Sequence, residues 1–155
     1  MVEVNGYKIG PSVDLTGASL RSAELEGVDL SFANLTRAQL CGPPPAFLGQ
    51  FSPGANLRFA NLSGANLTGA DLTGANLHGA NLTNANLTDA DLTRASLANA
   101  DLTGANLTGA DLGNADLTFA NFTQADLTDA YLYEATLAGT NFTDAILPDS
   151  SKYEW

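Results

Sequence analysis

The chain repeats nearly the same five letters for most of its length, as in GANLTGADLTGANLHGANL at residues 64–82. A large apolar residue, called the centre here, recurs at every fifth position from Leu15 to Leu40 and again from Leu57 to Leu147. Every centre is Leu except Phe122 and Phe142, and the residue two positions earlier is almost always Ala. The exceptions are Val13, Val28 and Thr140. The fold must therefore take one large and one small apolar side chain into its interior every five residues.

Neither regular element can use this period alone. In an α-helix each residue turns the chain by about 100°, so centres five positions apart would be spread over all sides. In a straight strand successive side chains alternate between two faces, and because five is odd, successive centres would point in opposite directions. The period therefore excludes one long helix and one long strand.

A chain that turns a corner after each short extended stretch satisfies the pattern. Within a repeat the Ala and the centre are two residues apart, so both point to the same side. A corner turns the next pair inward again, and four right-angle corners close a coil of about 20 residues, with coils stacked about 4.8 Å apart. The prediction is an all-β solenoid with leucine along its axis.

The repeat A(N/D)LTG resembles that of the pentapeptide-repeat family, and the resemblance extends from Val13 to Leu147. It implies a right-handed quadrilateral parallel β-helix, here of about six coils with four five-residue faces. We expect residues 1–12 to form an N-terminal cap with a β-hairpin, residues 13–147 the helix, interrupted by a loop at residues 41–54, and residues 148–155 a C-terminal tail or cap. The resemblance implies an architecture but no particular function, since this repeat occurs in proteins of many roles.

The centres should form the structural core, and each buried leucine should contribute about 1.5–3 kcal/mol before the loss of chain entropy. The corner position two after each centre is often Gly, which permits a sharp turn. Phe59 and Phe119 stand there instead, and we expect their rings to lie against neighbouring turns, or else to be exposed contact points. Thr follows most centres, where its hydroxyl is expected to bond the corner backbone. The candidate core residues are Leu62, Leu72, Leu82, Leu92, Leu102, Leu112, Phe122 and Phe142.

Negative charge dominates the surface, because the chain has 17 acidic and 6 basic side chains and a net charge of −11. On one expected face three aspartates precede successive centres: Asp71, Asp91 and Asp111, called the acidic ladder here. Carboxylates about 4.8 Å apart repel one another, and Asn would serve the same structure without that repulsion. The favoured interpretation is interchange of Asp and Asn at a tolerant site. The alternative is a line of charge that imitates a phosphate backbone.

Residues 41–54, CGPPPAFLGQFSPG, interrupt the five-residue register. Consecutive prolines favour a polyproline conformation and donate no backbone hydrogen bonds. We expect a loop that leaves one corner, with the helix resuming beneath it, and a boundary between two short helices is the alternative. Phe47, Leu48 and Phe51 either fold back onto the side of the helix or bind a partner.

The sequence offers no constellation for catalysis, for a cofactor or for a metal. The single histidine, His78, and the single cysteine, Cys41, should lie two coils apart, and no Cys and His cluster has the spacing of a zinc site. The glycines are spaced by five, as the coil demands, and form no phosphate-binding loop. Aspartates in a line do not surround a point as calcium ligands do. We expect neither an enzyme nor a cofactor.

An acidic surface argues against direct binding to nucleic acid or to an anionic membrane, since both need basic side chains. No apolar run is long enough to span a membrane. The N-terminal segment lacks the features of a signal peptide, so we expect a cytoplasmic location, an expectation that a removed leader would change.

The expected function is that of a non-enzymatic structural or protein-interaction scaffold with an unidentified protein partner. The resemblance also implies an alternative, because some family members mimic DNA, occupy the DNA-binding saddle of gyrase and protect it from quinolones. Those members are rich in Phe centres and Cys, whereas this chain is more similar to cyanobacterial and related bacterial members with Leu and Ala. An ice-binding threonine array is a remote third hypothesis. A second copy could cover an end coil and form a homodimer.

Overall fold

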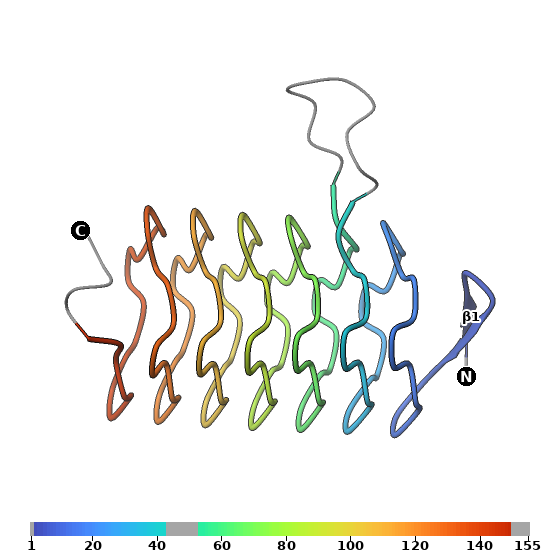
Figure 1. The fold of residues 1–155 in the computed structure, drawn as a ribbon, viewed down its shortest axis with the longest axis horizontal. Coiled ribbons are helices and arrows are strands. Elements are labelled where there is room, and N and C mark those ends of the chain that lie inside the picture. The colour runs from blue at the N-terminus through green and yellow to red at the C-terminus, as the bar shows by residue number, and fades with distance from the viewer. Residues whose placement is uncertain (1, 43–52, 150–155) are drawn as a thin grey trace.

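The computed structural model describes residues 2–42 and 53–149 and is a rod of stacked coils (Figure 1). The residue before each centre forms a parallel bridge to its counterpart in the next coil, as Asn56 does with Asn76, and Asn76 with Ser96. The bridges follow one another in four columns along the rod. The chain is therefore an all-β solenoid.

Each repeat is joined to the next coil by the same set of backbone hydrogen bonds. The N–H of Leu72 donates to the carbonyl of Asp91 at 2.7 Å, and the N–H of Gly74 donates to the carbonyl of Thr93 at 2.9 Å. In return, the N–H of Asp91 donates to the carbonyl of Ala70 at 2.9 Å. Stacking thus satisfies the backbone polar groups of a chain that forms no long strand.

The centres and their paired alanines fill the axis of the rod. Core residues that are at most 1 % exposed include Leu62, Leu72, Leu82, Leu92, Leu102, Leu112 and Phe122. Phe142, in the last described coil, is only partly buried. Its ring stacks on that of Phe122 with 5.3 Å between centroids and 26° between planes. Phe142 therefore packs against the core from one side.

The corners are tight turns at which the residue two after the centre has a positive φ, whether or not it is glycine. Gly69 has a φ of 61°, and Asp89, at the same corner one coil later, has a φ of 55°. The left-handed conformation costs about 1–2 kcal/mol for a residue with a side chain. The bonds between coils therefore impose this conformation on many residues that would otherwise avoid it.

The threonines after the centres bond a side chain, and the expectation of a backbone partner is wrong. The hydroxyl of Thr108 donates to Oδ1 of Asn106 at 2.7 Å, and the same oxygen accepts the N–H of Thr108 at 2.9 Å. Thr128 and Asp126 make the same pair of bonds. An Asn or Asp two residues earlier thus presents an acceptor to both donors of the threonine.

The two ends of the rod differ. At the N-terminal end β1 (Val2–Val4) and β2 (Tyr7–Ile9) form an antiparallel hairpin. Ile9 is buried, and the Tyr7 hydroxyl accepts the N–H of Ser19 at 3.2 Å, so the hairpin covers part of the first coil. At the other end Leu147 is 47 % exposed. Most of the expected C-terminal tail, residues 150–155, lies outside the described residues.

The insertion leaves the columns of bridges unbroken. Glu24 bridges Asn56, and Asp29 bridges Asn61, across the interruption. The N–H of Ala55 donates to the carbonyl of Leu40 at 2.6 Å, which brings the two ends of the insertion together at one corner. The coils on either side therefore stack as ordinary neighbours, and the alternative of two separate short helices is wrong.

Candidate functional site

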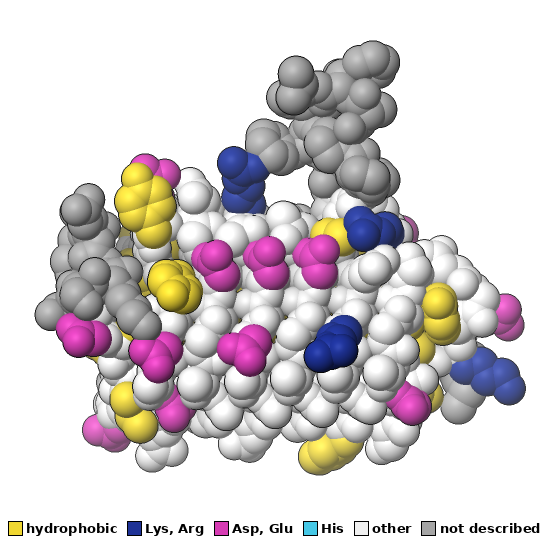
Figure 2. Space-filling model, in the orientation of Figure 1, with side chains coloured by type: hydrophobic (Ala, Val, Ile, Leu, Met, Phe, Trp, Pro, Cys, Tyr) yellow, Lys and Arg dark blue, Asp and Glu magenta, His cyan; other side chains and the backbone are white. Residues whose placement is uncertain are grey.

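The acidic ladder occupies one column of bridges, in which Asp71 pairs with Asp91, and Asp91 pairs with Asp111. The column begins at Ser19 and Gln39. Figure 2 shows acidic side chains following one another along the side of the rod. The three carboxylates thus share one face at the spacing of adjacent strands, about 4.8 Å.

Each ladder carboxylate is also an acceptor within its own turn. Oδ1 of Asp71, Asp91 and Asp111 accepts the N–H two residues later at 3.1, 2.9 and 2.9 Å respectively. Oδ1 of the neutral Asn106 accepts the equivalent N–H at 2.9 Å. This turn bond therefore needs only a side-chain oxygen, and it does not need a charge.

Asparagine columns are joined between coils in a way that the acidic ladder cannot be. The amide of Asn141 donates to Oδ1 of Asn121 at 3.1 Å and to the hydroxyl of Thr123 at 3.0 Å. A carboxylate has no hydrogen to donate, so successive ionised aspartates cannot bond one another in this way. Their charges instead repel. The fold therefore does not need negative charge at these three positions.

The ladder begins beside the stem of the insertion, which consists of Cys41–Gly42 and Pro53–Gly54. Nη1 of Arg21 donates to the carbonyl of Gly42 at 2.8 Å and contacts Sγ of Cys41 at 2.8 Å. Burial, and then the adjacent Asp71, raise the pKa of the Cys41 thiol to about 11. Burial opposes the ionisation of Asp71, but hydrogen bonds from Cys41 and its own turn, with the charge of Arg21, lower its pKa. Asp71 therefore stays ionised next to the stem.

The second limb of the stem is fixed as well. The hydroxyl of Ser22 donates to the carbonyl of Pro53 at 2.8 Å, and the N–H of Gly54 donates to the carbonyl of Gly74 at 3.1 Å. Both limbs are thus bonded to side chains of the first coil. The candidate partner-binding residues of the insertion lie outside the described residues and stay predictions. They are Phe47, Leu48 and Phe51.

Three exposed phenylalanines stand at corners, and each ring covers a glycine corner of the next coil. The pairs are Phe32 over Gly64, Phe59 over Gly79 and Phe119 over Gly139. The rings are 54 to 70 % exposed. They therefore rest on a neighbouring turn and still face solvent. Sequence reasoning missed Phe32, because the insertion separates it from Gly64 by more than the usual coil repeat.

The ring of His78 meets that of Phe59 edge-on, with 5.7 Å between centroids, and the Arg58 guanidinium lies 5.3 Å from the same Phe59 ring. This cluster holds no nucleophile. Within residues 2–42 and 53–149, no three His, Cys, Asp or Glu side chains are grouped so as to hold a metal ion. The same part of the chain has no helix that is long and apolar enough to cross a membrane.

The family model described as pentapeptide repeats matches the chain in 8 copies, over residues 12–42, 54–89, 85–124 and 110–149. No curated protein shows significant similarity to the chain.

Solved structures with the same fold include the following three. HetL, a pentapeptide repeat protein involved in heterocyst differentiation regulation in the cyanobacterium Nostoc sp. strain PCC 7120, is 38 % identical over 92 % of this chain, with a TM-score of 0.53. Rfr23 from the cyanobacterium Cyanothece 51142 is 32 % identical over 86 % of this chain and 88 % of its own, with a TM-score of 0.51. A thylakoid-lumen protein of Arabidopsis thaliana is 30 % identical over 72 % of this chain and 66 % of its own, with a TM-score of 0.52. The match spans 65 % of HetL.

Proposed function

The chain belongs to the pentapeptide-repeat family, and on that premise we propose that it is a non-enzymatic scaffold that binds a partner protein through its acidic ladder. The observation that carries the proposal is the column of three carboxylates in turns that need only a neutral oxygen. We further propose that the scaffold is a right-handed quadrilateral helix of about six coils, which the four columns of bridges support.

The solenoid suits such a role because it holds charges at fixed intervals. Parallel bridges on both sides fix the backbone of Asp91, and the turn bonds from Thr93 fix its carboxylate, at 2.9 Å from the N–H and 2.7 Å from the hydroxyl. Preorganised charges lose little conformational freedom on binding. The partner that fits this face is a protein with a basic surface, and the net charge of −11 would speed its approach.

The test is photo-crosslinking in the native host, with a photoreactive residue at Asn114, an exposed corner beside Asp111. The expected result is a discrete crosslinked protein that disappears when Asp71, Asp91 and Asp111 are all changed to Asn. A matched variant carries Asp89→Asn, Asp129→Asn and Asp144→Asn, which remove the same charge from exposed corners. Crosslinking that persists in the ladder variant, or that both variants lose equally, would refute the ladder as the binding face.

A second candidate, mimicry of DNA toward gyrase, is favoured by the same line of charge. Its test is a gyrase supercoiling assay, with and without a fluoroquinolone, on the wild type and both triple variants. Inhibition or protection that only the ladder variant loses would identify the partner as gyrase. The threonine array is poorly suited to ice binding, because hydroxyls such as that of Thr108 already donate to a neighbouring side chain.

A further inference from the structure

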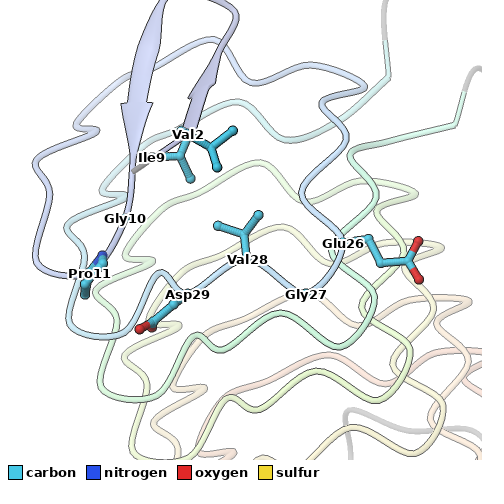
Figure 3. Close-up of a pocket in the computed structure, with 8 residues that line it drawn as sticks. All are labelled: Val2, Ile9, Gly10, Pro11, Glu26, Gly27, Val28 and Asp29. Atoms are coloured by element: carbon cyan, nitrogen blue, oxygen red, sulfur yellow. The ribbon is translucent and has the colours of Figure 1, made fainter.

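A pocket at the N-terminal end of the rod has no part in the proposed function (Figure 3). It has a volume of about 490 Å³ and lies between the hairpin and the first coil. Val2 and Ile9 lie on one side of it and Val28 on the other, and Glu26 and Asp29 flank Val28. The pocket is thus lined by apolar side chains, and the segment of the first coil that borders it begins with the carboxylate of Glu26 and ends with that of Asp29.

The backbone edge beside this pocket is open. In the middle of the rod the residue before a centre exchanges two bonds with the preceding coil, as Asp91 does with Ala70 and Leu72. The hydrogen bonds among the described residues include none to the backbone N–H or carbonyl of Glu24 or Asp29. Only after the pocket does the chain rejoin the edge, where the N–H of Ser12 donates to the carbonyl of Ser31 at 2.9 Å.

We propose that this open edge and its pocket bind an extended peptide that carries a lysine or arginine side chain. The peptide backbone takes the place of a preceding coil and exchanges hydrogen bonds with Glu24 or Asp29, as in other cases of strand addition to a free sheet edge. The aliphatic stem of the basic side chain lies on Val2 and Val28, and its charged head reaches Glu26 or Asp29.

Charge complementarity selects this occupant. Oδ1 of Asp29 accepts the N–H of Ser31 at 3.0 Å and the amide of Asn61 at 3.2 Å. Oε2 of Glu26 accepts the amide of Asn56 at 3.5 Å. These bonds among the described residues use one oxygen of each carboxylate, and a cationic head can donate to the other. An acidic peptide would be repelled by the same two groups.

The probe is a short acetylated and amidated peptide of alternating valine and lysine, titrated into isotopically labelled full-length protein. Backbone amide signals of Glu24, Asp29 and their neighbours are expected to shift, with an affinity in the micromolar to millimolar range, because a short strand buries little surface. Two control peptides separate the causes. One has N-methylated backbone amides and keeps its charge, and the other has glutamate in place of lysine.

The variant that tests the pocket is Glu26→Gln with Asp29→Asn. We expect it to preserve the fold, because Asn61 occupies the position equivalent to Asp29 in the next coil and Glu26 is exposed. It is expected to weaken peptide binding at least about tenfold. The matched variant, Asp89→Asn with Glu134→Gln, removes the same charge from exposed corners and is expected to leave the affinity unchanged.

Four results would overturn the proposal. These are no binding of the peptide, equal weakening by both variants, equal binding of the N-methylated peptide, and self-association of the protein that shifts the same edge amides. The last would make a second copy the occupant. The proposal is independent of the acidic ladder, so the Asp71/Asp91/Asp111→Asn variant is expected to bind the peptide normally.

Discussion

The coils in the middle of the rod and the last coil have the same sequence pattern but different burial. Leu102 and Leu112 are fully buried, whereas Leu137 is only partly buried and Leu147 is 47 % exposed. The middle leucines have a coil on each side, and the last ones have a described coil on one side only. A pentapeptide therefore does not bury its own centre, and burial comes from the neighbours.

The largest test of this comparison is a charge placed on the axis at each location. Leu92→Asp puts a carboxylate where the side chain is 0 % exposed and no partner exists, so we expect the protein to unfold. Leu147→Asp places the same carboxylate within reach of water and should lower the melting temperature by only a few degrees. Circular dichroism and thermal melting measure both. An equal fall in melting temperature for the two substitutions would show that the stacking of coils does not determine how deeply a leucine is buried.

A smaller effect is expected from shortening the two stacked phenylalanines. Phe122→Ala should lower the free energy of unfolding by about 3–5 kcal/mol, because the ring is fully buried. Phe142→Ala removes the same ring contact from a partly buried site and should cost about half as much. Urea denaturation gives both values. If Phe142→Ala cost as much as Phe122→Ala, the last coil would be as well packed as the middle.

The corners offer a smaller test, since only corners that follow another coil carry a neighbour's side chain. At Gly79 a new Cβ would lie 2.6 Å from the Phe59 ring, whereas at Gly17, in the first coil, nothing lies within 4 Å. Both glycines have a φ near +65°, so alanine costs about 1–2 kcal/mol at either position. Gly79→Ala should lower the free energy of unfolding by about 1 kcal/mol more than Gly17→Ala does. Chemical denaturation measures both values. Equal losses of unfolding free energy for the two substitutions would mean that the Phe59 ring moves aside without cost.

The smallest expected effect at neutral pH concerns the insertion stem, a third location, where the chain leaves the rod and returns to it. Burial raises the pKa of Cys41 from about 9 to about 11, so the folded protein favours the neutral thiol. This contribution to stability is fully present below pH 9 and is lost as the pH rises through about 11.

Thiolate absorbance should therefore titrate near pH 11 in the folded protein and near pH 9 in urea. A folded midpoint near 9 would contradict the burial of Cys41 beside Asp71.

The inward leucines and the columns of bridges could be predicted from the sequence, because both follow from the five-residue period. Asp71, Asp91 and Asp111 were placed in one column for the same reason. The five-residue period does not predict how the repeats contact segments outside the pattern, such as the insertion and the hairpin. The contacts of Arg21 with the stem depend on the path of the insertion, and the pocket depends on the angle at which the hairpin leaves the first coil. Phe47 and the other apolar residues of the insertion remain untested.

The bridges across the insertion have a consequence for how the rod is assembled. Glu24 meets Asn56, and Asp29 meets Asn61, as though the intervening residues were absent. The position of a segment in the rod is therefore determined by its bridges to neighbouring coils. The length of chain that connects two coils has little influence on how they stack. A cut within the insertion would leave two pieces held together by shared backbone bonds and interlocked leucines. The two sides of the insertion are joined by the same contacts as any two neighbouring coils, so a corner is where such a chain can accept new sequence without rearranging its core.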